Sequence, residues 1–130
     1  MKKYILDTTV CIALIRGNKK VLDAVYEKGL DNCSVSEITI AELLYGASKS
    51  GRASHFDDVR YILDAFEIMP IFPNLRTFAD VKCSLEKGGM RIDDFDLLIG
   101  ATALKNAMTL VTHNVKHFSR IPGILIEDWE

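Results

Sequence analysis

The sequence is poor in cysteine, and its three cysteines are neither clustered nor even in number. Cys11, Cys33 and Cys83 lie far apart, with no C-x-x-C spacing. This pattern argues against a disulfide framework and against a zinc knuckle. Free cysteine packs like a small hydrophobic residue, so we expect Cys11 and Cys33, which lie inside apolar runs, to be buried.

Long hydrophobic segments are also missing. No run approaches the roughly 20 apolar residues that a membrane-spanning helix needs. Lys2, Lys3 and the apolar residues after them imitate the start of a secretory signal, but Asp7 interrupts the run and no small-residue cleavage site follows. We therefore predict a first strand at residues 4–6, and a cytoplasmic protein without membrane contact.

The sequence also lacks a large net charge of either sign. The 16 basic and 18 acidic residues leave a net charge of −2. A protein that binds nucleic acid through charge alone is usually basic. The overall charge of this chain therefore provides no general electrostatic attraction for nucleic acid. The chain does have an ordinary hydrophobic content of 48% and enough length for a buried core. We predict one globular domain over residues 1–130.

Short β-favouring runs alternate with helical periodicity along the chain. The predicted strands are residues 4–6, 33–35, 68–72, 109–111 and 124–126. The predicted helices are residues 8–15, 19–28, a segment opened by Ser36 and Thr39 that ends near Gly46, and residues 56–66, 75–87 and 95–107. Such alternation is typical of a mainly parallel sheet covered on both faces. The predicted fold class is a three-layer α/β/α sandwich.

Three acids stand where predicted strands end or the following helices begin. Asp7 directly follows the first strand, Glu42 lies in the helix after the second strand, and Asp96 lies in the first turn of the most apolar helix. Ligand sites in open parallel sheets form beyond the carboxyl ends of the strands, so these side chains can meet there. Clustered carboxylates repel one another unless a cation lies between them, and Mg²⁺ prefers such oxygen ligands. This spacing indicates a candidate magnesium site.

Each acid also has a structural interpretation. Thr39 and Glu42 form a T-x-x-E pattern, which is typical of a capping box at a helix start. Asp93 and Asp96 are acids of the kind that the positive end of a helix favours. Asp7 is harder to explain in this way, because an acid that ends a buried strand costs free energy unless it is solvated or paired.

Four ordered segments resemble the motifs of the PIN-domain family. They are residues 5–10, residues 36–46, residues 94–104, and residues 110–114 with Phe118. The length and the ending, residues 122–129, are most similar to the VapC toxins of VapBC toxin–antitoxin pairs. The resemblance covers essentially the whole chain. It implies an endoribonuclease that depends on Mg²⁺ or Mn²⁺, forms a homodimer and is silenced by a cognate antitoxin.

The resemblance also implies roles for individual residues. The catalytic, metal-binding acids of the first three motifs fall on Asp7, Glu42 and Asp96. The fourth motif often carries another acid, and here that position is Asn114, whose amide adds no negative charge; we therefore expect one tightly held ion. Thr9 stands where asparagine or serine is common, and its hydroxyl would either orient Asp7 or cap the next helix.

Other residues in or near the motifs are candidates for supporting roles. Thr112 belongs to the fourth motif beside Asn114. One of Asp93 and Asp94 is expected to cap the helix that carries Asp96. The other would lie at the rim, where it could touch a metal-bound water, although a structural role is the simpler interpretation for both.

Basic side chains could line a path for an RNA backbone, because phosphate contacts position a strand without reading its sequence. The candidates lie in loops or near helix ends: Lys49, Arg52, Lys87, Arg91 and Lys116. His113, beside the fourth motif, is a further candidate for substrate contact. His113 and His117 are four residues apart, a spacing that suits metal binding, but ordinary surface positions are the simpler interpretation.

Parts of the sequence are also compatible with two other functions. A phospho-acceptor receiver domain also has an acidic magnesium pocket, but it needs an aspartate at the end of a middle strand and a lysine after a later one. Here Ser36 and residues 112–114 stand at those places. An inactive member that only binds RNA or a partner is kept open by Asn114, although a pure binder gains nothing from repelling carboxylates. If the protein is active, we expect Asp7→Asn or Asp96→Asn to abolish cleavage with equal or higher thermal stability.

Apolar residues on two neighbouring helices would form either a groove for an amphipathic antitoxin segment or part of the core. They are Leu43, Leu44, Tyr45, Ile62, Leu63 and Phe66. The sequence does not separate these two interpretations.

Overall fold

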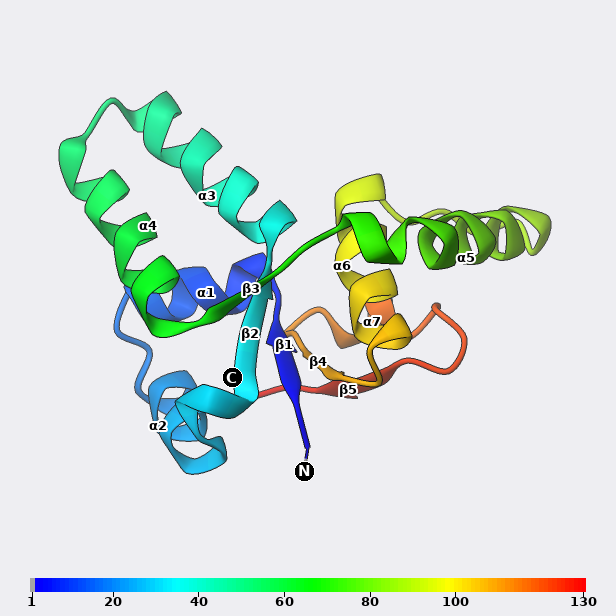
Figure 1. The fold of residues 1–130 in the computed structure, drawn as a ribbon, viewed down its shortest axis with the longest axis horizontal. Helices are drawn as coiled ribbons and strands as arrows, with labels where there is room; N and C mark the ends of the chain where they lie inside the picture. The colour runs from blue at the N-terminus through cyan, green and yellow to red at the C-terminus, as the bar shows by residue number, and fades with distance from the viewer. Residues whose placement is uncertain (1) are drawn as a thin grey trace.

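The computed structural model describes residues 2–130 and contains a five-stranded sheet. The strands are β1 (Tyr4–Leu6), β2 (Cys33–Ser36), β3 (Glu67–Met69), β4 (Thr109–Val111) and β5 (Leu125–Glu127). Their order across the sheet is β3-β2-β1-β4-β5, and every neighbouring pair is parallel. Figure 1 shows β1 at the centre of this sheet.

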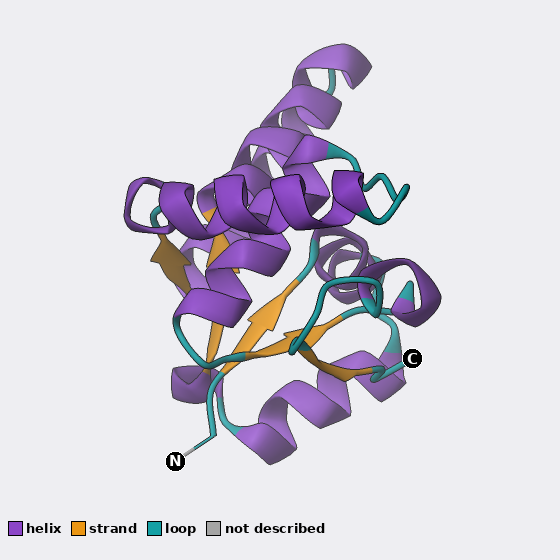
Figure 2. Cartoon of the chain, turned by 90° about the vertical axis from the view of Figure 1, so that its right-hand side faces the viewer, coloured by secondary structure: helices purple, strands orange, loops and turns teal. Residues whose placement is uncertain are grey.

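Helices connect the strands. They are α1 (Thr8–Ile15), α2 (Lys19–Lys28), α3 (Glu37–Ser50), α4 (Ala53–Ala65), α5 (Leu75–Lys87), α6 (Asp94–Lys105) and α7 (Val115–Phe118). Figure 2 shows helices on both sides of the strands. The predicted three-layer α/β/α sandwich with a parallel sheet is therefore confirmed. No helix in the described part of the chain is long and apolar enough to cross a membrane.

The core is divided by the sheet into two clusters, because successive residues of a strand point to opposite faces. On one face, Tyr4 and Leu6 pack with buried side chains of α1, α2 and α4: Val10, Leu14, Val21, Val25 and Ile62. On the other face, Ile5 packs with buried side chains of α5, α6 and α7: Val81, Leu85, Leu97, Ile99 and Phe118. The central strand is covered on both faces, so the residue that follows it is held rigidly.

The largest correction concerns α3, which was predicted to end near Gly46. The helix continues to Ser50 and ends at Gly51, which adopts the left-handed conformation with φ +68° and donates its N–H to the Ala47 carbonyl. The T-x-x-E capping box was also wrong. The N-cap is Ser36, whose Oγ accepts from the Ile38 N–H at 3.0 Å. Glu42 therefore lies a full turn inside the helix rather than at its cap.

Smaller differences occur at the sheet edges and helix ends. β3 stops at Met69, before Pro70, which has no N–H for the ladder, and Phe72–Asn74 is a 3₁₀ turn rather than strand. β5 begins one residue later than predicted, and α7 was not predicted. α4 begins earlier than predicted, and α6 ends at Lys105 rather than Ala107. Cys11 and Cys33 are buried, as expected.

Candidate active site

The site lies at the carboxyl edge of the sheet. Leu6, the last residue of β1, is in register with Val35 of β2 and with Val111 of β4. The chain positions just beyond these three strands therefore lie side by side. Asp7 is the residue after β1, and its N–H continues the ladder by donating to the Val111 carbonyl at 3.0 Å.

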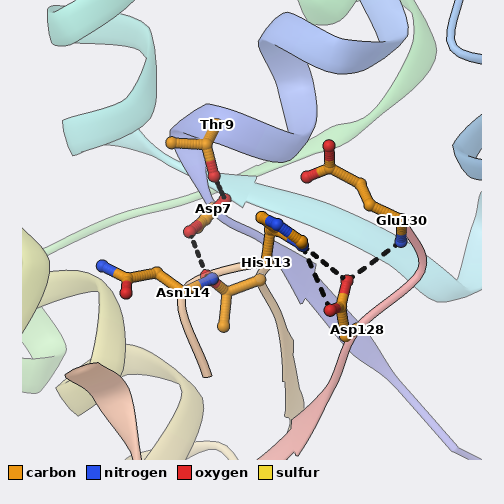
Figure 3. A network of polar contacts seen from close by, with 7 residues as sticks. Asp7, Thr9, His113, Asn114, Asp128 and Glu130 are labelled. Atoms are coloured by element: carbon orange, nitrogen blue, oxygen red, sulfur yellow. Dashed lines mark hydrogen bonds and ion pairs between the residues drawn. The ribbon is translucent and has the colours of Figure 1, made fainter. Parts of the chain in front are cut away.

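Asp7 is only 4% exposed, and its carboxylate accepts three hydrogen bonds. Oδ1 accepts from the Thr9 hydroxyl at 2.7 Å and from the Val10 N–H at 3.0 Å, which makes Asp7 the N-cap of α1. Oδ2 accepts from the buried Thr112 hydroxyl at 2.5 Å. Thr112 Oγ1 in turn accepts from the Asn114 N–H at 3.0 Å. Figure 3 shows this convergence of the start of α1 with the segment after β4.

Glu42 reaches the same edge from α3. Its Oε1 accepts from the Thr8 hydroxyl at 2.6 Å, and Thr8 is the residue next to Asp7. The hydroxyl oxygens of Thr8 and Thr39 are 3.1 Å apart. Because Thr8 has a single hydroxyl proton and gives it to Glu42, the buried Thr39 must be the donor in that contact. The two threonines thus fix the direction of the Glu42 carboxylate.

Asp96 reaches the edge from the first turn of α6. Its Oδ2 lies 3.1 Å from Nε2 of His117, on the short helix α7. Both side chains are partly buried, with 34% of Asp96 and 23% of His117 exposed. Asp93, the N-cap of α6, accepts from the Phe95 N–H at 3.1 Å. Asp93 therefore takes the capping role that the sequence left open between Asp93 and Asp94.

The three candidate acids share one electrostatic environment. Burial raises the pKa of Glu42 above its ordinary value, the Thr8 hydrogen bond opposes this, and the charges of Asp96, Asp93 and Asp7 raise it further. Burial likewise raises the pKa of Asp96; His117 opposes this, and Asp93 and Asp7 add to it. Neighbouring acids thus destabilise the charged forms of Glu42 and Asp96, as carboxylates at a cation site do.

Comparison with known proteins shows which family the chain belongs to. The family model described as PIN domain matches residues 4–124. The chain belongs to the PIN-domain family. A ribonuclease VapC2 of Rickettsia felis is 32% identical, with 98% of each chain covered. A tRNA(fMet)-specific endonuclease VapC of Salmonella typhimurium is 29% identical, with 99% of each covered.

Solved structures agree with this membership. The VapBC2 complex of Rickettsia felis bound to a DNA fragment from its promoter contains a chain that superposes with a TM-score of 0.91 at 30% identity, covering 98% of both chains. A DNA-bound VapBC complex of Salmonella typhimurium gives a TM-score of 0.88 at 27% identity, covering 100% of both. These PIN-domain structures share the fold over its whole length.

The donor chemistry of this PIN domain fits a hard divalent cation. Three carboxylates approach from three segments, and the raised pKa values of Glu42 and Asp96 mark a place where a positive charge is stabilising. Within residues 2–130, however, no three Asp, Glu, His or Cys side chains are already grouped so that they could hold one ion. Each carboxylate is instead turned to a partner within the chain, namely the threonines, the Val10 N–H or His117. An ion would therefore have to compete with these partners for the oxygens of Glu42 and Asp96.

The supporting candidates lie in different surroundings. Asn114 and His113 line a cleft of about 720 Å³ with Thr9 and Arg16, so the fourth motif does lie beside the start of α1. His113 Nδ1 is 3.2 Å from Asp128 Oδ2 in the C-terminal segment (Figure 3). Asp94 forms an exposed ion pair of 2.8 Å with Lys82. Asp94 lies in the first turn of α6, and its pairing with Lys82 was not predicted.

The basic candidates are scattered. Lys49 lies in the last turn of α3, roughly 10 Å along the helix axis from Glu42, because each helical residue adds about 1.5 Å. Arg52 lies beyond the end of α3, as the N-cap of α4. Figure 1 shows these two helices extending away from the sheet. Arg91 lines a cleft of about 350 Å³ with Asp93 and Asp94. Exposed Lys116 lies on α7, next to His117.

The proposed groove residues divide between core and surface. Ile62 and Phe66 are buried in the core, and Leu43 packs against it. Tyr45 is 68% exposed, and Leu44 and Leu63 are also exposed. A cleft of about 270 Å³ between α1, α3 and α4 is lined by Glu42, Leu43 and neighbours.

Sequence reasoning missed Thr8 and His117. Thr8 is part of the first motif, and only the three-dimensional packing of α1 on α3 brings its hydroxyl to Glu42. His117 was interpreted as a surface histidine, but it is partly buried against Asp96. The signal that could have identified it is Phe118, whose buried ring anchors α7 and so fixes the preceding residue.

Proposed function

We propose that the protein is a metal-dependent endoribonuclease, the toxin of a VapBC-type pair, with Mg²⁺ as the expected ion and Mn²⁺ as the other candidate. The observation that carries this proposal is that Asp7, Glu42 and Asp96 approach one sheet edge of a PIN domain closely enough for the charges of Asp7 and Asp96 to act on Glu42, and that of Asp7 on Asp96. The reaction is hydrolysis of an RNA phosphodiester bond. Relatives named as ribonucleases over nearly the whole chain support this reaction class.

Each candidate residue has a defined part in this proposal. Asp7, Asp96 and Glu42 would hold the ion, which when bound supplies a Lewis acid for the phosphate and lowers the pKa of a water. Thr9 and Thr112 keep the Asp7 carboxylate in one orientation through bonds of 2.7 and 2.5 Å. An orientation fixed by hydrogen bonds before substrate arrives reduces the reorganisation needed in the reaction.

The proposal extends to partners and location. The solved relatives are VapBC complexes, and two of them are bound to DNA, so a cognate antitoxin is the expected protein partner of this chain. We also propose a homodimer that acts in the cytoplasm on RNA. Because the net charge is −2, phosphate contacts must come from local cations, for which Lys49, Arg52, Arg91, Lys116 and His113 remain the candidates.

The decisive experiment is cleavage of an RNA pool, with initiator tRNA included because a relative is named for it. Purified protein is incubated with Mg²⁺, with Mn²⁺ and with EDTA. Asp7→Asn is compared with Asp23→Asn, which changes an exposed acid on α2. We expect EDTA and Asp7→Asn each to lower the rate by roughly 100-fold or more, since a metal ion contributes several kcal/mol to such reactions. Cleavage that survives both changes would exclude the assignment.

An inactive RNA- or partner-binding module is the second candidate, favoured by Asn114 in the fourth motif. It predicts that RNA binds equally with and without EDTA and is never cut. Filter binding on the samples of the cleavage assay separates the two functions.

A further inference from the structure

His117 occupies a position that the proposed function has not used. Its Nε2 is 3.1 Å from the Asp96 Oδ2, and within residues 2–130 it is the one side chain that hydrogen-bonds Asp96. The neighbouring Phe118 is 2% exposed and contacts the His117 ring edge-on, with centroids 5.2 Å apart and planes at 81°. The imidazole is therefore held in place by the core rather than free in solvent.

This contact places a nitrogen atom that could bind a metal next to the oxygen atoms of the candidate metal site. The side chains that hydrogen-bond Asp7 and Glu42 all do so through hydroxyls, and oxygen groups of this kind suit hard ions such as Mg²⁺. Imidazole nitrogen is a poor ligand for Mg²⁺ but a good one for divalent transition metals. Mn²⁺ accepts carboxylate oxygen as Mg²⁺ does. As a divalent transition-metal ion it also gains more from an imidazole nitrogen than Mg²⁺ does, although less than the later first-row ions.

We propose that His117 is a nitrogen ligand to the ion held by Asp96, and that it gives this site a preference for Mn²⁺ over Mg²⁺. This inference rests on the metal site of the proposed function. It differs from a purely structural role, in which His117 would only hold the Asp96 carboxylate and would affect both ions equally.

The first test detects the nitrogen directly. Pulsed electron paramagnetic resonance on the Mn²⁺-loaded protein reports ¹⁴N nuclei bound to the ion. We expect a ¹⁴N coupling in the wild type, its loss in His117→Gln, and its retention in His113→Gln. His113 is the matched control because its ring pairs with Asp128 in the C-terminal segment instead of with Asp96. The wild-type spectrum does not depend on whether any variant folds.

The second test compares affinities by calorimetry on the same proteins, with folding checked by circular dichroism. In His117→Gln we expect Mn²⁺ affinity to fall by about 10-fold or more while Mg²⁺ affinity changes little. His117→Glu replaces nitrogen by carboxylate oxygen and is expected to restore binding with the preference shifted toward Mg²⁺.

The outcomes separate this inference from the proposed function. Mn²⁺ bound without ¹⁴N coupling, or an equal loss of both ions in His117→Gln, would overturn the role of His117 and leave the nuclease proposal standing. A wild-type protein that binds neither ion would overturn the metal-dependent nuclease and this inference together.

Discussion

At the scale of single residues, the three candidate acids are stabilised to different degrees. Asp7 is almost fully buried and accepts three hydrogen bonds, including one from a backbone N–H. Glu42 and Asp96 accept fewer hydrogen bonds, and burial raises the pKa of each. Neutral substitution is therefore expected to relieve repulsion at Glu42 or Asp96. At Asp7 a neutral substitution also disturbs the three hydrogen bonds that the carboxylate accepts. The structure therefore replaces the expectation of equal or higher stability for Asp7→Asn by one of lower stability.

Glu42→Gln tests the repulsion. The folded-state pKa of Glu42 is raised, so between the ordinary value of 4.5 and the folded value the native protein binds more protons than the unfolded chain. Stability must fall as pH rises through this window, and the cost persists at neutral pH. We expect Glu42→Gln to raise stability in EDTA at pH 7 by at most about 1 kcal/mol, because water still screens the carboxylate.

Urea unfolding at several pH values measures this effect, with exposed Glu27→Gln as the control. The gain should shrink as pH is lowered through the window, because Glu42 becomes neutral in the wild type as well. A gain that is independent of pH would mean that charge is not its cause.

Thr112→Val tests the orientation of Asp7. Valine keeps the shape, but it removes the proton donated to Asp7 Oδ2 and the acceptor for the Asn114 N–H. We expect a loss of about 1–3 kcal/mol in the free energy of unfolding, because both groups lose a buried partner. RNA cleavage should fall more than stability accounts for, whereas Thr112→Ser should retain most of both. Cleavage unchanged in Thr112→Val would show that Asp7 needs no such support.

At the scale of elements, the central strands and most helices were predictable because their signals are local. β1, β2 and β4 are short β-favouring runs buried along their whole length. α2 has the predicted cap, with Asn18 Oδ1 accepting from the Val21 N–H at 3.2 Å. The errors arose where tertiary packing decides the outcome. α7 is a single turn that the buried side chain of Phe118 fixes in the core. A helix of this length is too short to show a helical pattern of hydrophobic residues in the sequence.

The two glycines of α3 explain the error in its predicted end. Gly46 lies in the helix interior with nothing within 4 Å of an added Cβ, whereas Gly51 has φ +68°. We expect Gly46→Ala to stabilise the protein by about 0.5–1 kcal/mol through helix propensity. Gly51→Ala should destabilise it by about 1 kcal/mol, because an L side chain is strained there. Thermal unfolding of both variants checks this, and equal effects would contradict the assigned helix end.

At the scale of the whole molecule, the sequence predicted which segments reach one edge of the sheet, but not how the acids they carry are held. The parallel order of β1, β2 and β4 was enough to bring Asp7 and the start of α3 to one edge. The contacts that direct the acids join residues 34 positions apart for Thr8 and Glu42, and 105 apart for Asp7 and Thr112. Such pairings depend on how helices pack across the sheet, so local patterns do not contain them.

The same packing leaves an apolar surface on α3 and α4 for which a partner is expected. Tyr45, Leu44 and Leu63 are exposed there, and an antitoxin segment that covered them would bury aromatic area, which dominates binding energies. We expect Tyr45→Ser to weaken the complex with the product of the adjacent gene by roughly 10- to 100-fold. Calorimetry of the purified pair measures this, with Tyr26→Ser on α2, which alters a tyrosine of similar exposure (65%), as the control. Equal loss in both variants would indicate a general effect of surface aromatics, and no loss in either would place the antitoxin on another face of the molecule.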